Sequence, residues 1–257
     1  FNNTTAGENG GAIYSAVTSD SFDVINSTFN DNSAIKGASI YAGGVMNLED
    51  STFNCPNATG SAVIYLYTNN NVNLNNNTIE SNLLAIYNTA GIITSPTTLT
   101  FNTVTVEKGE NATLSAVFTD DNGNIIGSNT NVKGKVNGTS VFFRFNETTR
   151  NFTAVYTNTA NEGKYPVTGS FSIASDCDVT DGALYVGQVF EIDAPSIVKY
   201  YKNGTQFIVK LTENGRAIVG SQVEITINGA TYKRTTDMNG TAKLNINLAP
   251  GEYDVNV

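Results

Sequence analysis

The reactive side chains of this 257-residue chain are carboxylates, lysines and tyrosines, because the sequence has no histidine, no tryptophan and only two cysteines. The lack of histidine excludes a Ser-His-Asp triad and an HExxH zinc site. Cys55 and Cys177 have no histidine or basic residue beside them to activate the thiol, so we interpret both as small packing side chains.

Two acidic segments are candidates for binding calcium. The first contains Asp120 and Asp121, and the second contains Asp176, Asp178 and Asp181. Grouped oxygen ligands of this kind suit calcium. Neither segment has the glutamate at the last position of an EF-hand loop, and a solvated hairpin turn and an acidic loop explain both segments without a metal. We therefore predict no cofactor, with calcium as the alternative.

Enzymatic cleavage of a polysaccharide would require carboxylates clustered beside lysine or arginine. Residues 1–96 contain several Asp and Glu side chains but a single basic residue, Lys36. Asp31 recurs in phase with none of the other carboxylates, among them Asp20. We predict that the chain is not an enzyme.

Four tyrosines recur in phase along the first third of the chain. Each directly follows the isoleucine of a repeated segment, and they are Tyr14, Tyr41, Tyr65 and Tyr87. Successive side chains of a strand point to opposite faces, so an inward isoleucine turns its tyrosine outward. We expect the four rings to form a row on one face, the tyrosine ladder. Such a row can bind sugars or a partner protein; the alternative is that the rings only cover the side of the repeat.

The repeat itself predicts the fold of residues 1–96. Its isoleucines are 27, 24 and 22 residues apart, and a second motif at 26–32 returns at 50–57. A period of this length fits one coil of a parallel β-helix with three short strands per coil, and coils stack about 4.8 Å apart. The asparagine run at 69–77 fits a corner where stacked amides form a ladder; a polar loop is the alternative.

Two β-sandwich modules are predicted after the repeats. Pro96 ends the periodic segment, and from Thr97 short alternating runs are separated by turn residues, among them Asn122-Gly123. A boundary at Ala194-Pro195 is followed by another set of alternating strands. The predicted domains are therefore 1–96, 97–193 and 194–257.

Charge and composition exclude several classes of partner. Charged residues make up 14% of the chain and the net charge is −9, a poor match for nucleic acid or anionic lipid. The 36 asparagines and 33 threonines favour turns and strands. The sequence has no run of 18 apolar residues, so we predict that it does not span a membrane.

The repeat resembles that of a known family. Gly10-Gly11-Ala12-Ile13 and Phe29-Asn30-Asp31-Asn32 resemble the repeat of polymorphic outer membrane proteins, which is also abundant in adhesin-like surface proteins of methanogenic archaea. The second copy, Gly37-Ala38-Ser39-Ile40, matches in part. The resemblance covers residues 1–96 and implies a right-handed β-helix on a secreted or surface protein.

The end of the chain resembles the last domain type of the methanogen adhesins over 198–207, 235–242 and 249–253. Its closing part also resembles the prealbumin-like repeats of bacterial surface proteins. The resemblance implies a tandem stalk domain with a structural role.

Stalk domains of this kind sometimes carry an internal Lys–Asn isopeptide bond promoted by a buried acid. The resemblance offers Lys199 or Lys202 as the lysine, Glu224 as the acid and Asn256 as the asparagine. The alternation of apolar residues around Glu224 turns this carboxylate outward, where it would not promote the condensation. The residues themselves therefore argue against the bond.

The sequence as a whole predicts an all-β fragment of a cell-surface adhesin-like protein, with a short right-handed parallel β-helix followed by two Ig-like β-sandwich domains. We expect it to be extracellular and non-catalytic, and to attach through the tyrosine ladder to a glycan or protein on a host or microbial cell surface. A purely structural cell-wall or stalk protein and a fragment of a carbohydrate-active β-helix enzyme are the alternatives. The sequence leaves the ligand, the wall-anchoring mode and the oligomeric state open.

Overall fold

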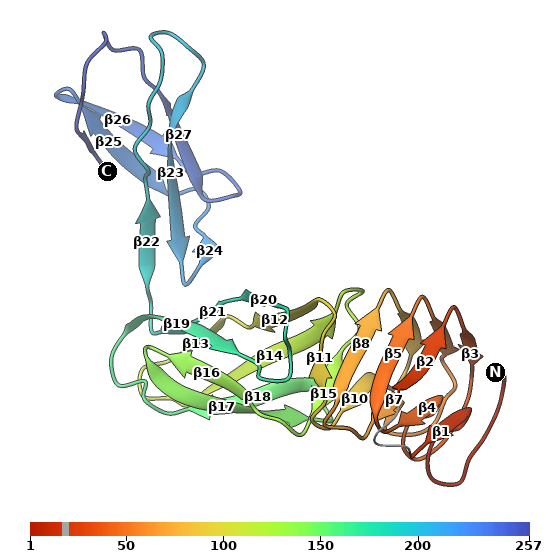
Figure 1. Cartoon of the computed structure of the whole chain (residues 1–257). Helices are drawn as coiled ribbons and strands as arrows, with labels where there is room; N and C mark the ends of the chain where they lie inside the picture. The colour runs from red at the N-terminus through yellow and green to blue at the C-terminus, as the bar shows by residue number, and fades with distance from the viewer. Residues whose placement is uncertain (17–20) are drawn as a thin grey trace. The chain divides into compact units, whose positions relative to one another are not determined.

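The computed structural model describes residues 1–16 and 21–257, and all regular elements in these ranges are β-strands (Figure 1). This confirms the prediction of an all-β chain. No helix in the described ranges is long and apolar enough to cross a membrane. Contacts divide the chain into two compact units, one of residues 1–159 and 165–184 and the other of residues 160–164 and 185–257.

The first part of unit 1 consists of three parallel sheets. The chain visits the sheets in turn, so each coil adds one strand to each sheet. The five-stranded sheet contains β1 (Ile13–Ser15), β4 (Ile40–Ala42), β7 (Ala62–Leu66), β10 (Leu84–Asn88) and β15 (Ile126–Ser128). The four-stranded sheet contains β2 (Ser21–Ile25), β5 (Val45–Glu49), β8 (Asn71–Asn75) and β11 (Ile92–Ile93). The three-stranded sheet contains β3 (Thr28–Asn30), β6 (Thr52–Cys55) and β9 (Thr78–Ser81).

Equivalent residues of successive coils lie directly over one another. Phe29 pairs with Phe53 in register, and their rings are stacked with centroids 4.6 Å apart. Both side chains are fully buried. The corner after the four-stranded sheet repeats as well, because Asn26, Asp50 and Asn76 all have positive φ. Asn and Asp tolerate this left-handed backbone better than most residues, which explains their place in the repeat.

The asparagine run at 69–77, which we expected at a corner, forms strand β8 over 71–75 and reaches the corner only at Asn76. Val72 and Leu74 point into the core and are fully buried, so the asparagines between them alternate to the outer face. On that face the Asn73 amide donates to Asn47 Oδ1 of the previous coil at 2.7 Å. The predicted contact between stacked amides therefore forms on a strand.

The second part of unit 1 is built from antiparallel strands. Nine strands form one hydrogen-bonded path in which β17 pairs with both β16 and β18. They are β12 (Thr97–Phe101), β13 (Val104–Val106), β14 (Ala112–Asp120), β16 (Val132–Val136), β17 (Thr139–Asn146), β18 (Asn151–Tyr156), β19 (Gly163–Ser170), β20 (Cys177–Thr180) and β21 (Gly182–Val186). Phe118, Phe152 and Phe171 pack edge to face in their core.

Residues of this second part close the end of the parallel sheets. After Asn122-Gly123 the chain does turn back, with a bridge between Thr119 and Ile125, but the returning strand β15 pairs with β10 in parallel. The segment at 173–175 hydrogen-bonds Ile93 on the adjoining sheet. An open sheet edge leaves N–H and C=O groups unpaired, and these two segments pair them. Contacts therefore join the predicted module 1–96 and most of the predicted module 97–193, namely residues 97–159 and 165–184, into one unit.

Asp120 holds the turn that leads into β15. Its carboxylate accepts hydrogen bonds from the backbone N–H groups of Asn122 and Asn124 and from the Asn124 amide. The same Asn124 amide donates to the carbonyl of Asn77, so the turn is anchored on the coil beside it. Burial raises the pKa of Asp120 to about 6. The hydrogen bonds to its carboxylate act in the opposite direction and lower this pKa.

Unit 2 contains two small antiparallel sheets that face each other. One has β22 (Phe190–Asp193), β23 (Gln206–Glu213), β24 (Arg216–Ala217) and β27 (Thr241–Asn245), and the other has β25 (Gln222–Ile227), β26 (Ala230–Thr235) and β28 (Val255–Asn256). Between them lies a core that includes Phe207, Val209 and Ile225. The predicted boundary at Ala194 is too late, because β22 pairs with β23 and belongs to this unit.

The Phe29–Phe53 contact predicts a large effect of truncation. Phe53→Ala should lower the free energy of unfolding of unit 1 by about 3–5 kcal/mol, because it leaves a cavity between two coils. Denaturant unfolding followed by circular dichroism measures this. Phe142→Ala is the control, since Phe142 is 58% exposed and its loss should change little. Equal effects of the two variants would contradict the packing described.

Burial of Asp120 predicts a pH dependence of stability. The folded chain keeps this proton up to a pH of about 6, whereas the unfolded chain releases it near 3.8. Stability should therefore rise as the pH falls through this window, by roughly 1 kcal/mol per pH unit. Asp120→Asn should flatten this slope relative to the unmodified chain in denaturant unfolding between pH 4 and 7. An unchanged slope in the variant would exclude Asp120 as its source.

Candidate binding site on the tyrosine ladder

Parallel pairing places the four tyrosines of the ladder next to one another. Tyr14, Tyr41, Tyr65 and Tyr87 occupy one register position of β1, β4, β7 and β10. Successive ring centroids are 5.5, 5.4 and 4.9 Å apart, and the ring planes differ by 15°, 13° and 21°. Neighbouring strands of a sheet are about 4.8 Å apart, which brings rings at one register position into stacking distance.

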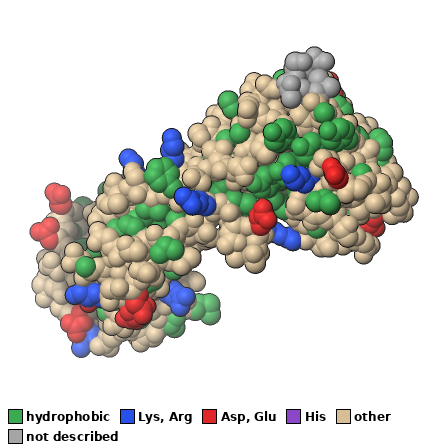
Figure 2. Space-filling model, turned by 90° about the horizontal axis from the view of Figure 1, so that it is seen from below, with side chains coloured by type: hydrophobic (Ala, Val, Ile, Leu, Met, Phe, Trp, Pro, Cys, Tyr) green, Lys and Arg blue, Asp and Glu red, His purple; other side chains and the backbone are tan. Residues whose placement is uncertain are grey.

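The ladder lies on the outer face of the five-stranded sheet. The isoleucines that precede Tyr41, Tyr65 and Tyr87 are fully buried, while these three tyrosines are half-buried and Tyr14 is 58% exposed. Figure 2 looks at the molecule from below, the side on which β1, β4 and β7 lie in Figure 1, and shows a broad patch of hydrophobic side chains with few charged groups. The face is therefore aromatic, accessible and weakly charged.

Two further aromatic rings extend the ladder. Tyr67 lies two residues after Tyr65 on the same strand face, and its ring is parallel to that of Tyr41 at 6.4 Å. Phe145 of β17 meets Tyr87 edge to face at 6.0 Å. The alternation of residues along a strand was the signal in the sequence that Tyr67 points to the same side as Tyr65. Nothing in the sequence connects Phe145 with the repeat, because it arrives through the fold of the antiparallel strands.

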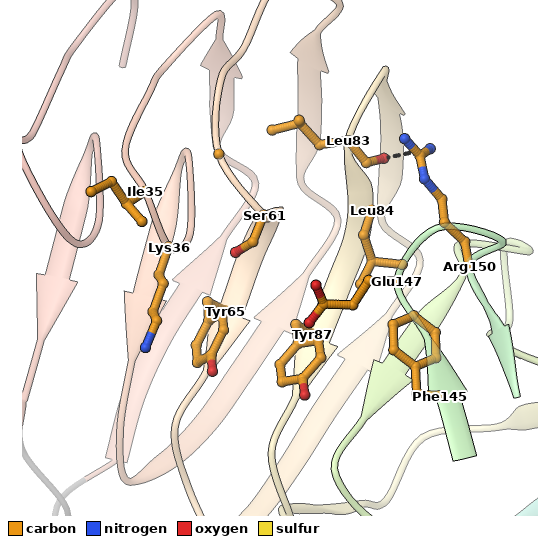
Figure 3. A pocket seen from close by; sticks show the side chains of 11 residues that line it. Ile35, Lys36, Ser61, Tyr65, Leu83, Leu84, Tyr87, Phe145, Glu147 and Arg150 are labelled. Atoms are coloured by element: carbon orange, nitrogen blue, oxygen red, sulfur yellow. Dashed lines mark hydrogen bonds between the residues drawn. The ribbon is translucent and has the colours of Figure 1, made fainter. Parts of the chain in front are cut away.

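A hollow of about 370 Å³ lies at the Phe145 end of the ladder, and we call it the ladder hollow. Figure 3 shows the rings of Tyr65 and Tyr87 side by side in it, with Lys36 on one side, Phe145 on the other and the Glu147 carboxylate close to both rings. Lys36 comes from the second coil and Glu147 from the turn after β17, so distant segments of unit 1 form this hollow.

The charged groups of the ladder hollow differ in their contacts. Lys36 Nζ lies 5.4 Å from the centroid of the Tyr65 ring, a cation–π contact. The ion pairs found in residues 1–16 and 21–257 include neither Lys36 nor Glu147. Arg150, in contrast, donates to the carbonyls of Leu83 and Asn82 and so fastens the turn to the last coil. Lys36 and Glu147 are thus two charged groups of the hollow whose side chains a ligand would meet without breaking an ion pair.

Three phenols of the ladder, those of Tyr41, Tyr65 and Tyr87, have a raised pKa. Burial raises the pKa of Tyr41, Tyr65 and Tyr87, and the neighbouring phenols raise it further. The negative charge of Glu147 adds to this increase for Tyr65 and Tyr87. The Tyr87 hydroxyl also donates to Asn129 Oδ1, just after β15. At neutral pH the ladder therefore presents hydroxyl groups that can both donate and accept hydrogen bonds.

The structure gives two of the calcium candidates other partners. Asp120 is buried in the turn described above, and Asp121 Oδ2 accepts the backbone N–H of Asn76 at 2.9 Å. Asp176, Asp178 and Asp181 are exposed around β20. In the part of the chain that the structure describes, three or more His, Cys, Asp or Glu side chains are nowhere grouped for a metal. Cys55 is buried and Cys177 is half-buried; both are free thiols.

The isopeptide candidates make other contacts in the structure. Lys199 Nζ donates to the carbonyls of Thr205 and Ile246, both at 2.7 Å. The exposed Glu224 carboxylate pairs with Lys233 at 3.0 Å, on the outward side that strand alternation indicates. Lys202 is over the ring of Tyr201, and Asn256 is exposed on β28, where it pairs with Thr226, two residues from Glu224.

Comparison with known proteins finds weak structural similarity. No protein-family model and no curated protein matches the chain. It is similar to the Escherichia coli adhesin FdeC, with a TM-score of 0.27 and 17% identity over 64% of this chain and 60% of that chain. It is also similar to fibronectin(III)-like modules of Clostridium thermocellum CbhA, with a TM-score of 0.22 and 14% identity over 61% of this chain and 82% of that chain. It is similar as well to a 1.5-MDa bacterial ice-binding adhesin, with a TM-score of 0.21 and 17% identity over 62% of this chain and 56% of that chain.

The influence of Glu147 on the ladder is testable by titration. Glu147→Gln should lower the raised pKa of Tyr65 and Tyr87 toward the ordinary phenol value, because it removes a nearby negative charge. Tyr41 serves as the internal control, since its pKa does not depend on Glu147. NMR titration of the tyrosine ring carbons between pH 8 and 12 resolves the three residues. A shift of Tyr41 alone would contradict the geometry of the hollow.

Proposed function

We propose that this chain is part of an extracellular, non-catalytic adhesin-like protein of a cell surface, and that the tyrosine ladder binds a glycan or protein on a host or microbial cell. The observation that carries this proposal is the ladder itself. It places four aromatic rings in register on an accessible face with few charges and ends in a hollow. Exposed aromatic patches of this kind are typical of interaction sites.

In this proposal, residues 1–96 are coils of a parallel β-helix, right-handed as the resemblance implies, and the antiparallel modules are Ig-like stalk domains. Three parallel sheets whose equivalent positions stack in register support the β-helix. The pairing of β15 with β10 supports a stiff connection between the coils and the first stalk module. The resemblance to surface proteins of methanogenic archaea supports the cellular location.

The contacts of the carboxylates in the coils favour a non-catalytic role. Asp31 accepts the backbone N–H of Asn57 at 3.0 Å, and Glu49 accepts the amide of Asn73 at 2.6 Å. Asp50 accepts the amide of Asn76 at 2.7 Å, so all three link one coil to the next. Asp20 lies outside the described residues. These carboxylates have structural partners and are not arranged as an acid–base pair.

A purely structural stalk or wall protein is the second candidate. The half-buried state of Tyr41, Tyr65 and Tyr87 favours it, because rings that cover a sheet stabilise the fold without any ligand. In that case the ladder would have no saturable partner, which separates the two candidates.

Replacement of all four ladder tyrosines by serine tests the proposal. The labelled chain should bind a panel of microbial cells and purified polysaccharides saturably, and the variant should lose this binding. Tyr200→Ser with Tyr201→Ser is the matched control, because both side chains are exposed on unit 2. Circular dichroism monitors whether the serine variant folds. If it does not fold, a Tyr→Phe version of the ladder takes its place, because phenylalanine keeps the aromatic rings.

Two outcomes would contradict the binding role. Binding that survives loss of the ladder would place the site elsewhere in the chain. If the unmodified chain binds no cell or polysaccharide saturably, the structural stalk is the better description.

A further inference from the structure

We infer that the ladder hollow is the anchoring subsite for an uncharged glycan, with one sugar ring over Tyr65 and Tyr87, and Glu147 and Lys36 hydrogen-bonded to its hydroxyl groups. This inference rests on the proposed function and specifies its ligand and its principal contact. Four properties of the hollow support it: its volume, its aromatic lining, the polar groups at its edge and its charge.

The size of the hollow suits a sugar ring that belongs to a longer chain. A volume of about 370 Å³ lies at the lower end of the range of small-molecule sites. The hollow opens along the ladder, because Tyr65 and Tyr87 line it and the row continues through Tyr41 to Tyr14. A row of rings that continues beyond the hollow suits a ligand that is a linear chain.

The floor of the hollow is aromatic. The parallel rings of Tyr65 and Tyr87 have centroids 4.9 Å apart, and Phe145 closes one side (Figure 3). The C–H face of a pyranose ring is apolar and packs against aromatic rings, which gain contact without losing hydrogen bonds. Tyr65 and Tyr87 are stacked on each other, so a single sugar would pack across the exposed sides of both rings.

The rim of the hollow supplies polar groups of both kinds. The Glu147 carboxylate accepts hydrogen bonds from sugar hydroxyls, and the Lys36 ammonium group donates to hydroxyl and ring oxygens. Such bonds to charged groups are stronger than those between neutral groups. Because neither side chain has an ion-pair partner in the described ranges, a ligand would not have to break one.

Charge selects against ionic ligands. Lys36 repels a cationic ligand, while Glu147 and the net charge of −9 repel an acidic polysaccharide. Arg150 keeps its positive charge while it donates to the carbonyls of Leu83 and Asn82, so the lining of the hollow carries charges of both signs. A neutral glycan has no net charge for either sign to repel, and its hydroxyl groups can hydrogen-bond to both Lys36 and Glu147.

The experiment measures binding of the whole chain to immobilised neutral glucan, mannan and galactan, to acidic polygalacturonate, and to protein extracted from microbial cell surfaces. The variants are Glu147→Gln and Lys36→Met. The control is Glu107→Gln with Lys108→Met, an exposed acid and base of the same unit that lie away from the hollow. Circular dichroism and thermal unfolding verify that each variant is folded.

We expect saturable binding to at least one neutral polysaccharide, weakened about tenfold or more by either hollow variant and unchanged in the control. Polygalacturonate should bind at least about tenfold more weakly. Hollow variants that bind as well as the unmodified chain, while the ladder variant does not, would overturn this inference and leave the proposed function standing. Saturable binding of a surface protein alone would also overturn it, and no saturable binding to any probe would overturn both.

Discussion

The register of the parallel coils is the constraint on which the rest of unit 1 depends. Each residue of a coil must lie about 4.8 Å from its equivalent in the next coil, because backbone hydrogen bonds set the strand separation. This one spacing stacks Phe29 on Phe53 inside the sheets and places Tyr41 beside Tyr65 outside them. The core and the candidate binding surface are therefore two faces of the same strand pairing, and a slip of register would disrupt both.

The end of the parallel sheets creates a second requirement, because the last strands would expose unpaired backbone groups. β15 and the segment at 173–175 supply the missing partners, and Asn124 and Arg150 bind carbonyls of the last coils. The same antiparallel strands bring Phe145 and Glu147 to the ladder. Closing the sheet edge and completing the ladder hollow are thus consequences of one junction.

Sparse charge shapes the character of the site. Along the coils, asparagine and serine hold carboxylates and corners through hydrogen bonds, as Asn73 does for Glu49. Charged groups near the ladder are few, and the field there comes mainly from Lys36, Glu147 and Arg150. A surface of this kind discriminates ligands by shape, aromatic contact and hydroxyl geometry more than by long-range attraction.

Periodicity in the sequence by itself determined the all-β character, the positions of the ladder tyrosines and the outward direction of Glu224. These features depend on alternation within a strand and on repetition at one spacing, which are local properties of the chain. Only the tertiary structure decided that β15 joins the parallel sheet, that β22 belongs to unit 2, and that Phe145, Glu147 and Lys36 meet at one hollow. These contacts join segments far apart in sequence, and they form because a sheet edge must be paired and a core must be closed. Neither requirement produces a regular spacing of residues in the sequence.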